Sequence, residues 1–312
     1  MTTKTALAFA AVVSTAAGLL AADTPQNVFG VGILRRDGVL IPFATFDGRR
    51  WRNTWPAPDR ELTVPVNLDS VPKGWWGPTG PLQAWHAWVD GTSRPVRVTQ
   101  PDWVDVHCAR HLALKTDYRG EGVLPSEKEQ PYPKDGLATA PLQRVEPIEM
   151  VSPTAEERRA LAPVVLEAFN HAERETASRS SGHPVARRSR EPIEPAIEAL
   201  YAFGESPRIY YVEASRAYRA LGQGAGECQA VAFGTGWFVR EGAAVRSLVA
   251  ALDLLDCDRL GASYMLPLGV IRAGGRLFWL AQFSGWEHER YAVLEITPKK
   301  VEVMVSTWGG GC

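Results

Sequence analysis

Two carboxylates and one imidazole form the first set of residues that could do chemistry. Glu287 and His288 are adjacent and follow Trp286, and Glu213 lies in the earlier run IYYVEASRAY. General acid–base catalysis needs a proton donor and a proton acceptor within hydrogen-bond reach of the substrate. If the fold brings Glu213 beside Glu287 and His288, these residues predict a hydrolase site. The alternative is a solvated turn.

Two histidines spaced four residues apart form the second set. His107 and His111 flank Cys108 in the segment HCARH. On a helix this spacing would turn both imidazoles to one side, where they could hold zinc with a third ligand. The segment contains no glutamate, so it lacks the metalloprotease pattern. We favour an interpretation in which Cys108 is oxidised and both histidines lie at a surface turn, and no motif of the sequence predicts a cofactor.

Tryptophan is concentrated in one stretch. Seven of the eleven tryptophans lie there: Trp51, Trp55, Trp75, Trp76, Trp85, Trp88 and Trp103. An exposed indole offers flat apolar area with a polar edge, which suits glycan and peptide ligands. In QAWHAWV, the two-residue period of a strand puts Trp85 on one face, expected in the core, and His86 with Trp88 on the other. We predict a ligand platform of Trp75, Trp76, Trp88 and His86; the alternative is that the indoles fill a small core.

The first residues have the pattern of an export signal. Lys4 precedes an apolar run from Ala6 to Ala22 that is rich in alanine, and small residues occupy its end. A bilayer-spanning helix needs about 20 strongly apolar residues, so a retained anchor is the weaker interpretation. We predict a signal peptide over residues 1–22, a secreted or periplasmic location, and no membrane insertion after cleavage.

The cysteines are expected to form two disulfides, because exported proteins fold in an oxidising compartment. There are four: Cys108, Cys228, Cys257 and Cys312. If a hairpin turns near Gly242, Cys228 faces Cys257 at a separation that a disulfide can span. Cys108 then pairs with Cys312; the alternative joins Cys257 to Cys312. Oxidation also argues against Cys228 as a nucleophile.

Turn residues predict the elements that position these side chains. Asp37-Gly38, Asp47-Gly48 and Asp90-Gly91 each separate apolar runs, which is a hairpin signal. We therefore predict a small Trp-rich antiparallel β domain over residues 25–118. Residues 119–150 contain closely spaced Pro and Gly without an apolar period, so they are predicted to form a linker.

The sequence of residues 151–312 predicts a different architecture for the second half of the chain. Ser152 and Thr154 can cap a helix whose apolar stripe runs from Leu161 to Ala172. Pro163 is expected to kink or restart that helix. Seven strand-like runs with short connections follow. The fold class is therefore α+β, with one or two helices packed on an antiparallel meander.

Charge and composition restrict the function. The formal net charge is −1, and loss of Lys4 with the signal peptide removes a further positive charge, so nucleic acid is not an expected partner. We predict an exported non-enzymatic protein that binds a glycan, a peptide or an envelope protein. The alternatives are a secreted hydrolase that uses the carboxylates and His288, and a structural component of an envelope assembly.

Overall fold

The computed structural model describes residues 28–53, 55, 84–126, 128–179, 182–190, 192–219 and 227–312. The predictions on the signal peptide, Trp75 and Trp76 lie outside these residues. The described part consists of three antiparallel sheets and two helices. This composition confirms the predicted α+β class.

The N-terminal sheet contains eight strands in the order β5-β4-β8-β1-β2-β7-β6, with β3 paired to β2. Their bounds are β1 Phe29–Arg35, β2 Val39–Phe46, β3 Trp51–Arg52, β4 Trp85–Val89, β5 Thr92–Val96, β6 Val98–Val106, β7 Ala109–Thr116 and β8 Lys134–Ala140. The three predicted Asp-Gly turns join β1 to β2, β2 to β3 and β4 to β5. At the last of these, φ is 48° at Asp90 and 75° at Gly91, the positive values that such a tight hairpin needs.

Strand β8 changes the interpretation of residues 119–150, which were predicted to form a linker. This strand lies between β1 and β4 and pairs with both. Its sequence KDGLATA has no apolar alternation, because its buried positions are mostly small residues. Only glycine fits at position 136, because a Cβ on Gly136 would lie 2.1 Å from the carbonyl oxygen of Trp88. A segment without a visible period therefore forms an inner strand.

The helix-backed sheet has five strands in the order β13-β12-β11-β10-β9. They are β9 Glu149–Met150, β10 Ala196–Phe203, β11 Arg208–Arg219, β12 Cys228–Glu241 and β13 Ala244–Leu255; the helices are α1 Glu156–Arg179 and α2 Arg187–Arg190. Helix α1 packs Leu161, Val165 and Phe169 against one face of this sheet. The helix continues through Pro163 as one element, which corrects the predicted restart. Pro163 lies beyond the first turn and lacks the N–H that would bond to the carbonyl oxygen of Arg159.

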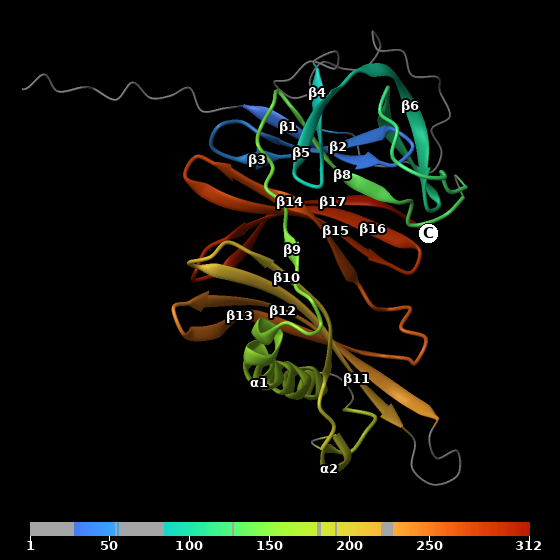
Figure 1. The fold of residues 1–312 in the computed structure, drawn as a ribbon. Coiled ribbons are helices and arrows are strands. Elements are labelled where there is room, and N and C mark those ends of the chain that lie inside the picture. The colour runs from blue at the N-terminus through green and yellow to red at the C-terminus, as the bar shows by residue number, and fades with distance from the viewer. Residues whose placement is uncertain are drawn as a thin grey trace, which may run out of the picture.

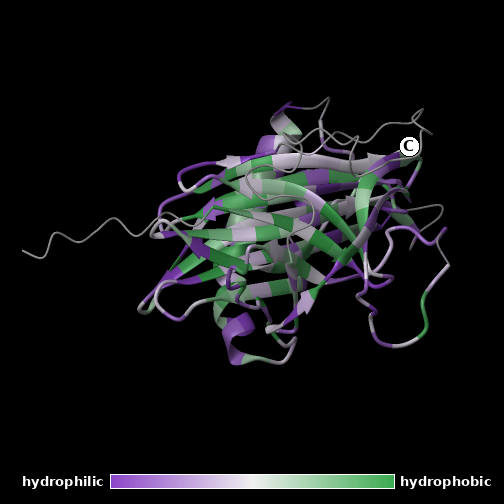
Figure 2. Cartoon of the chain, turned by 90° about the horizontal axis from the view of Figure 1, so that it is seen from above, coloured by the Kyte–Doolittle hydropathy of each residue, from purple (hydrophilic) through white to green (hydrophobic). Residues whose placement is uncertain are grey.

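The C-terminal sheet lies between the other two sheets. Its strands, in the order β14-β15-β16-β17, are β14 Tyr264–Ala273, β15 Arg276–Gly285, β16 His288–Ile296 and β17 Val301–Gly311. One face shares a core with β1 and β2 through Phe278 and Val293, and the other packs Trp279 and Leu294 against the helix-backed sheet. Figure 1 shows the resulting layers, with α1 outermost. In Figure 2, hydrophobic residues follow the strands and hydrophilic residues occupy the turns.

Two disulfides connect distant parts of the chain as predicted. Cys228 pairs with Cys257 at a Cα–Cα distance of 6.0 Å, and Cys108 pairs with Cys312 at 4.9 Å. The second joins the β6–β7 turn of the N-terminal sheet to the end of β17. These disulfides are compatible with a protein that folds outside the cytoplasm. None of the helices within the described ranges has the length and apolar character to cross a membrane.

Candidate functional site

A hollow of about 980 Å³ opens in the N-terminal sheet beside the place where β2 meets β7. These two strands pair at two positions, Val39 with Lys115 and Leu40 with Leu114. We call the hollow the polar groove. Its lining includes Arg35, Asp37, Thr99, Gln100, Asp102, Trp103, Asp105, Lys115, Thr116, Asp117, Arg119 and Leu124. Most of these side chains can donate or accept a hydrogen bond.

Arg35 and Asp37 form one side of the polar groove. Arg35 Nη2 lies 2.6 Å from Asp37 Oδ2, and Arg35 Nε donates to Asp37 Oδ1 at 3.2 Å. Arg35 Nη1 also donates to the carbonyl oxygen of Asp105 at 3.4 Å, and the guanidinium stacks 4.0 Å from the ring centre of Tyr132. The Arg35 side chain is 4% exposed. These contacts hold the cation and its carboxylate in a fixed orientation.

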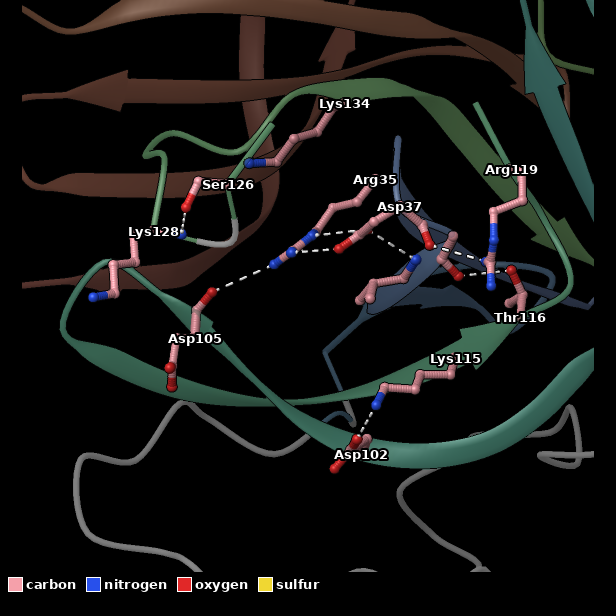
Figure 3. Close-up of polar contacts among 12 residues, drawn as sticks. Arg35, Asp37, Asp102, Asp105, Lys115, Thr116, Arg119, Ser126, Lys128 and Lys134 are labelled. Carbon is pink, nitrogen blue, oxygen red and sulfur yellow. Dashed lines mark hydrogen bonds and ion pairs between the residues drawn. The ribbon is translucent and has the colours of Figure 1, made fainter. Parts of the chain in front are cut away.

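The opposite side of the polar groove is built by β6, β7 and the residues that follow β7. Lys115 forms an ion pair with Asp102 across the β6–β7 hairpin. Arg119 Nη1 donates to the carbonyl oxygens of Asp37 and Tyr118 at 3.1 and 2.7 Å. Figure 3 shows the Arg35–Asp37 pair and the Lys115–Asp102 pair facing the same space from different strands. The groove therefore alternates cations and carboxylates.

Trp103 adds an aromatic surface to the polar groove. It is half-buried and packs against the core on the inner side of the N-terminal sheet. Strand β6, which carries it, is at one end of the strand order. Asp102, Trp103 and Asp105 come from the single run VTQPDWVDV. Successive strand residues point to opposite faces, so Trp103 projects on the same side as its register partner Leu112, and Asp102 projects to the other face of β6.

A buried ion pair lies behind the polar groove and joins two sheets. Lys134 Nζ of β8 lies 2.7 Å from Glu289 Oε2 of β16, and both side chains are almost completely buried. Burial lowers the pKa of Lys134, and the charge of Glu289 opposes this effect. Burial also raises the pKa of the neighbouring Tyr291 well above its usual value. Lys134 is the register partner of Arg35, so the buried pair adjoins one side of the groove.

The acid–base candidates are at separate positions. Glu213 is 4% exposed on β11, and its Oε1 accepts the backbone N–H of Met265 at 2.6 Å. Burial raises the pKa of Glu213 to about 7, and the nearby Glu198 adds to the effect. Glu287 is exposed in the β15–β16 turn, and His288 Nδ1 lies 3.1 Å from the carbonyl oxygen of Trp286. In the described part of the chain, no contact joins Glu213 to Glu287 or His288.

The two candidate metal ligands have different environments. His107 lies in the β6–β7 turn with φ 53°, and His111 is completely buried in β7. Burial lowers the pKa of His111 to about 4. The segment is thus a turn followed by a strand, not a helix. Cys108 is oxidised and His107 lies in the turn as expected, but the expected surface position is wrong for His111, which β7 places in the core. Across the residues that the structure describes, no three His, Cys, Asp or Glu side chains are placed to share a metal ion.

The predicted tryptophan platform is described only in part. Trp85 is 3% exposed, which confirms its place in the core, and Trp51 and Trp55 are buried as well. His86 and Trp88 are half-buried on β4. Trp88 lines a smaller hollow of about 140 Å³ between the N-terminal and C-terminal sheets. Because Trp75 and Trp76 lie outside the described residues, the platform stays a prediction.

The residues of the polar groove were not predicted as a site. The strongest local signal for the groove is the pair of acids that flanks Trp103 in VTQPDWVDV. Arg35 and Asp37 were interpreted only as part of a turn. Nothing in the sequence shows that this turn faces β6, because their proximity depends on how the sheet curves.

No protein-family model, curated protein or solved structure significantly matches this chain. The described fold defines a class: an α+β protein of three stacked antiparallel sheets with one long covering helix. Its function must therefore be inferred from the side chains of its sites.

Proposed function

We propose that this chain is an exported, non-enzymatic protein that binds a glycan in the polar groove. The observation that carries the proposal is that the groove is lined by two ion pairs, Arg35–Asp37 and Lys115–Asp102, together with Trp103. Each sugar hydroxyl both donates and accepts hydrogen bonds, so a glycan site needs carboxylates and cations at neighbouring positions. The indole of Trp103 would contact the apolar face of a sugar ring. The volume also lies within the range of about 300–1,000 Å³ that is usual for ligand sites.

The contacts in the groove favour binding over catalysis. Asp37 and Asp102 are each paired with a cation, so both carboxylates already have a charged partner. Glu213, the carboxyl group whose pKa lies near neutrality, is buried between other sheets and does not line the groove. A proton donor for hydrolysis would have to reach the scissile bond directly. We therefore place the hydrolase interpretation second.

The location is proposed together with the function. The two disulfides support folding in an oxidising compartment, and residues 1–22 have the pattern of a signal peptide. A secreted or periplasmic protein would meet glycans of an envelope or of the surroundings. The expected partner is therefore a carbohydrate, with peptide and envelope protein as the alternatives.

An oligosaccharide array followed by calorimetry tests this proposal. The Asp102→Ala variant should bind the best array ligand about tenfold more weakly than the unmodified protein, because one charged hydrogen-bond partner is lost. Asp253→Ala is the matched control, since Asp253 is an exposed aspartate on β13, outside the groove. Absence of any ligand on the array, or equal weakening by both substitutions, would contradict the proposal.

A further inference from the structure

A row of three side chains crosses the C-terminal sheet on the face that packs toward the helix-backed sheet. Phe283 of β15 is the register partner of Arg290 of β16, and Arg290 is the register partner of Trp308 of β17. Directly opposed antiparallel residues project to the same face, with Cβ atoms about 4.5–5.5 Å apart. The Arg290 guanidinium lies 4.6 Å from the ring centre of Phe283. We call these three residues the Arg290 row.

The helix-backed sheet covers the Phe283 end of the row, and Tyr211 of that sheet also interacts electrostatically with Arg290. Tyr211 of β11 lies 6.5 Å from the Phe283 ring centre. Beyond it, Trp308 is 43% exposed, and Trp286 in the adjacent turn is 58% exposed. These are the two most exposed tryptophans among the residues that the structure describes. The open end of the row therefore presents indole surface to solvent.

Arg290 differs from other partly buried arginines because it has no carboxylate partner within the described ranges. Its Nη1 donates to Ser306 Oγ at 3.1 Å, which leaves other N–H groups of the planar guanidinium for a ligand. Burial lowers the pKa of Arg290. By contrast, hydrogen bonds to glutamates raise the pKa of Arg259 and Arg276. A half-buried cation without a counter-charge is a site that an anion can complete.

We propose that the Arg290 row is a second ligand site, separate from the polar groove, which binds a sugar ring that carries a carboxylate. The carboxylate would accept two parallel hydrogen bonds from the guanidinium of Arg290, a geometry that suits arginine. The ring would lie against the neighbouring indole of Trp308. A hexuronate unit of an acidic glycan has both groups, because its carboxylate is bonded directly to the sugar ring. An acidic peptide has the charge without the flat ring.

Calorimetry on the disulfide-bonded, full-length mature protein tests the site with a trisaccharide of galacturonic acid and with its methyl ester. The two probes share their rings and differ in charge. The unmodified protein should bind the acid about tenfold more tightly than the ester. Arg290→Gln should abolish that preference and leave binding of the ester unchanged, whereas Trp308→Ala should weaken both. Arg290→Lys keeps the charge but loses the planar guanidinium that donates two parallel hydrogen bonds. Its preference for the acid should lie between those of the unmodified protein and Arg290→Gln.

Matched controls separate this site from structural effects and from the polar groove. Arg272→Gln removes another arginine that lies over a phenylalanine ring, 5.4 Å from the centre of Phe203, but is paired with Glu146; it should change neither affinity. Asp102→Ala in the groove should also leave the preference for the acid intact. Equal binding of acid and ester, an unchanged preference in Arg290→Gln, or equally tight binding of tetraglutamate would overturn the proposal. The groove could still bind a neutral glycan in each of these cases.

Discussion

Two arginines on two sheet faces show how covering a face changes the role of a charge. Arg216 is 2% exposed beneath α1, and its guanidinium contacts Glu173 Oε2 at 2.9 Å and Asn170 Oδ1 at 2.8 Å. Arg290 lies at the edge of the area that the helix-backed sheet covers, and its hydrogen-bond partner in the described part is Ser306. The helix that buries Arg216 also supplies its counter-charge. Among the described residues no carboxylate pairs with Arg290 at this margin, which leaves room for a ligand.

Replacing Arg216 should have the largest effect on stability. Arg216→Met leaves Glu173, which is 4% exposed, without its closest cation, and loss of one partner of a buried pair costs about 3–5 kcal/mol. The free energy of unfolding from urea denaturation measures this loss. The double variant Arg216→Met/Glu173→Leu should recover only part of it, because the buried Arg190 and the hydroxyl of Tyr218 also lose Glu173 as a partner. A single variant within about 1 kcal/mol of the unmodified protein would show that the pair is not a buried one.

The two disulfides should differ in their contribution to stability. The bond Cys108–Cys312 spans 204 residues of sequence, and Cys228–Cys257 spans 29. Loss of a native disulfide typically costs about 2–5 kcal/mol, and the loop-entropy account makes the longer loop worth about 2 kcal/mol more. We expect Cys108→Ser/Cys312→Ser to destabilise the protein more than Cys228→Ser/Cys257→Ser in parallel denaturation curves. The reverse order would mean that local packing at the hairpin outweighs loop length.

The buried Glu213 should make stability depend on pH. Burial raises its folded-state pKa to about 7 from an ordinary value of 4.5. Below pH 4.5 the carboxyl is protonated in both states; between 4.5 and 7 only the folded state keeps the proton, so stability falls as pH rises through this window. The loss is at most about 3 kcal/mol. Glu213→Gln keeps an acceptor for the Met265 N–H and lacks this titration.

The difference between the two proteins isolates the effect of Glu213 from other titrating groups. Relative to the unmodified protein, Glu213→Gln should gain stability between pH 4 and pH 8, as measured by thermal and urea unfolding at each pH. A constant difference across this range would show that the carboxyl has the same pKa in both states.

Local patterns predicted the parts of the fold that depend on neighbours in sequence. The Asp-Gly turns formed where expected because two adjacent residues decide their geometry. The disulfide between Cys228 and Cys257 likewise depends on a single hairpin, formed by β12 and β13. Its register shifts by one residue, since Phe238 pairs with Ser247 and Trp237 pairs with Val249. The shift leaves the cysteines close enough to bond.

Long-range packing set the features that the sequence could not reveal. Strand β8 is held by β1 and β4, which are distant in the chain, and its small residues hide its period. The C-terminal sheet contacts both other sheets, so neither half of the chain contains all of its core neighbours. The polar groove and the Arg290 row depend on the same contacts. Residue types suggest their chemistry, but only the stacking of the sheets brings their members together.

Replacing Arg290 should have the smallest effect on stability. Arg290→Met removes a half-buried cation that has no carboxylate partner in the described part, and the methionine side chain can still pack against Phe283. We expect the free energy of unfolding to change by no more than about 0.5 kcal/mol. A gain in stability would also fit a residue that is retained for ligand binding and not for folding. The substitution is chemically the same as Arg216→Met, so urea denaturation of the two variants compares their environments directly. If Arg290→Met loses as much stability as Arg216→Met, Arg290 is a structural residue and the contrast between covered and uncovered faces fails.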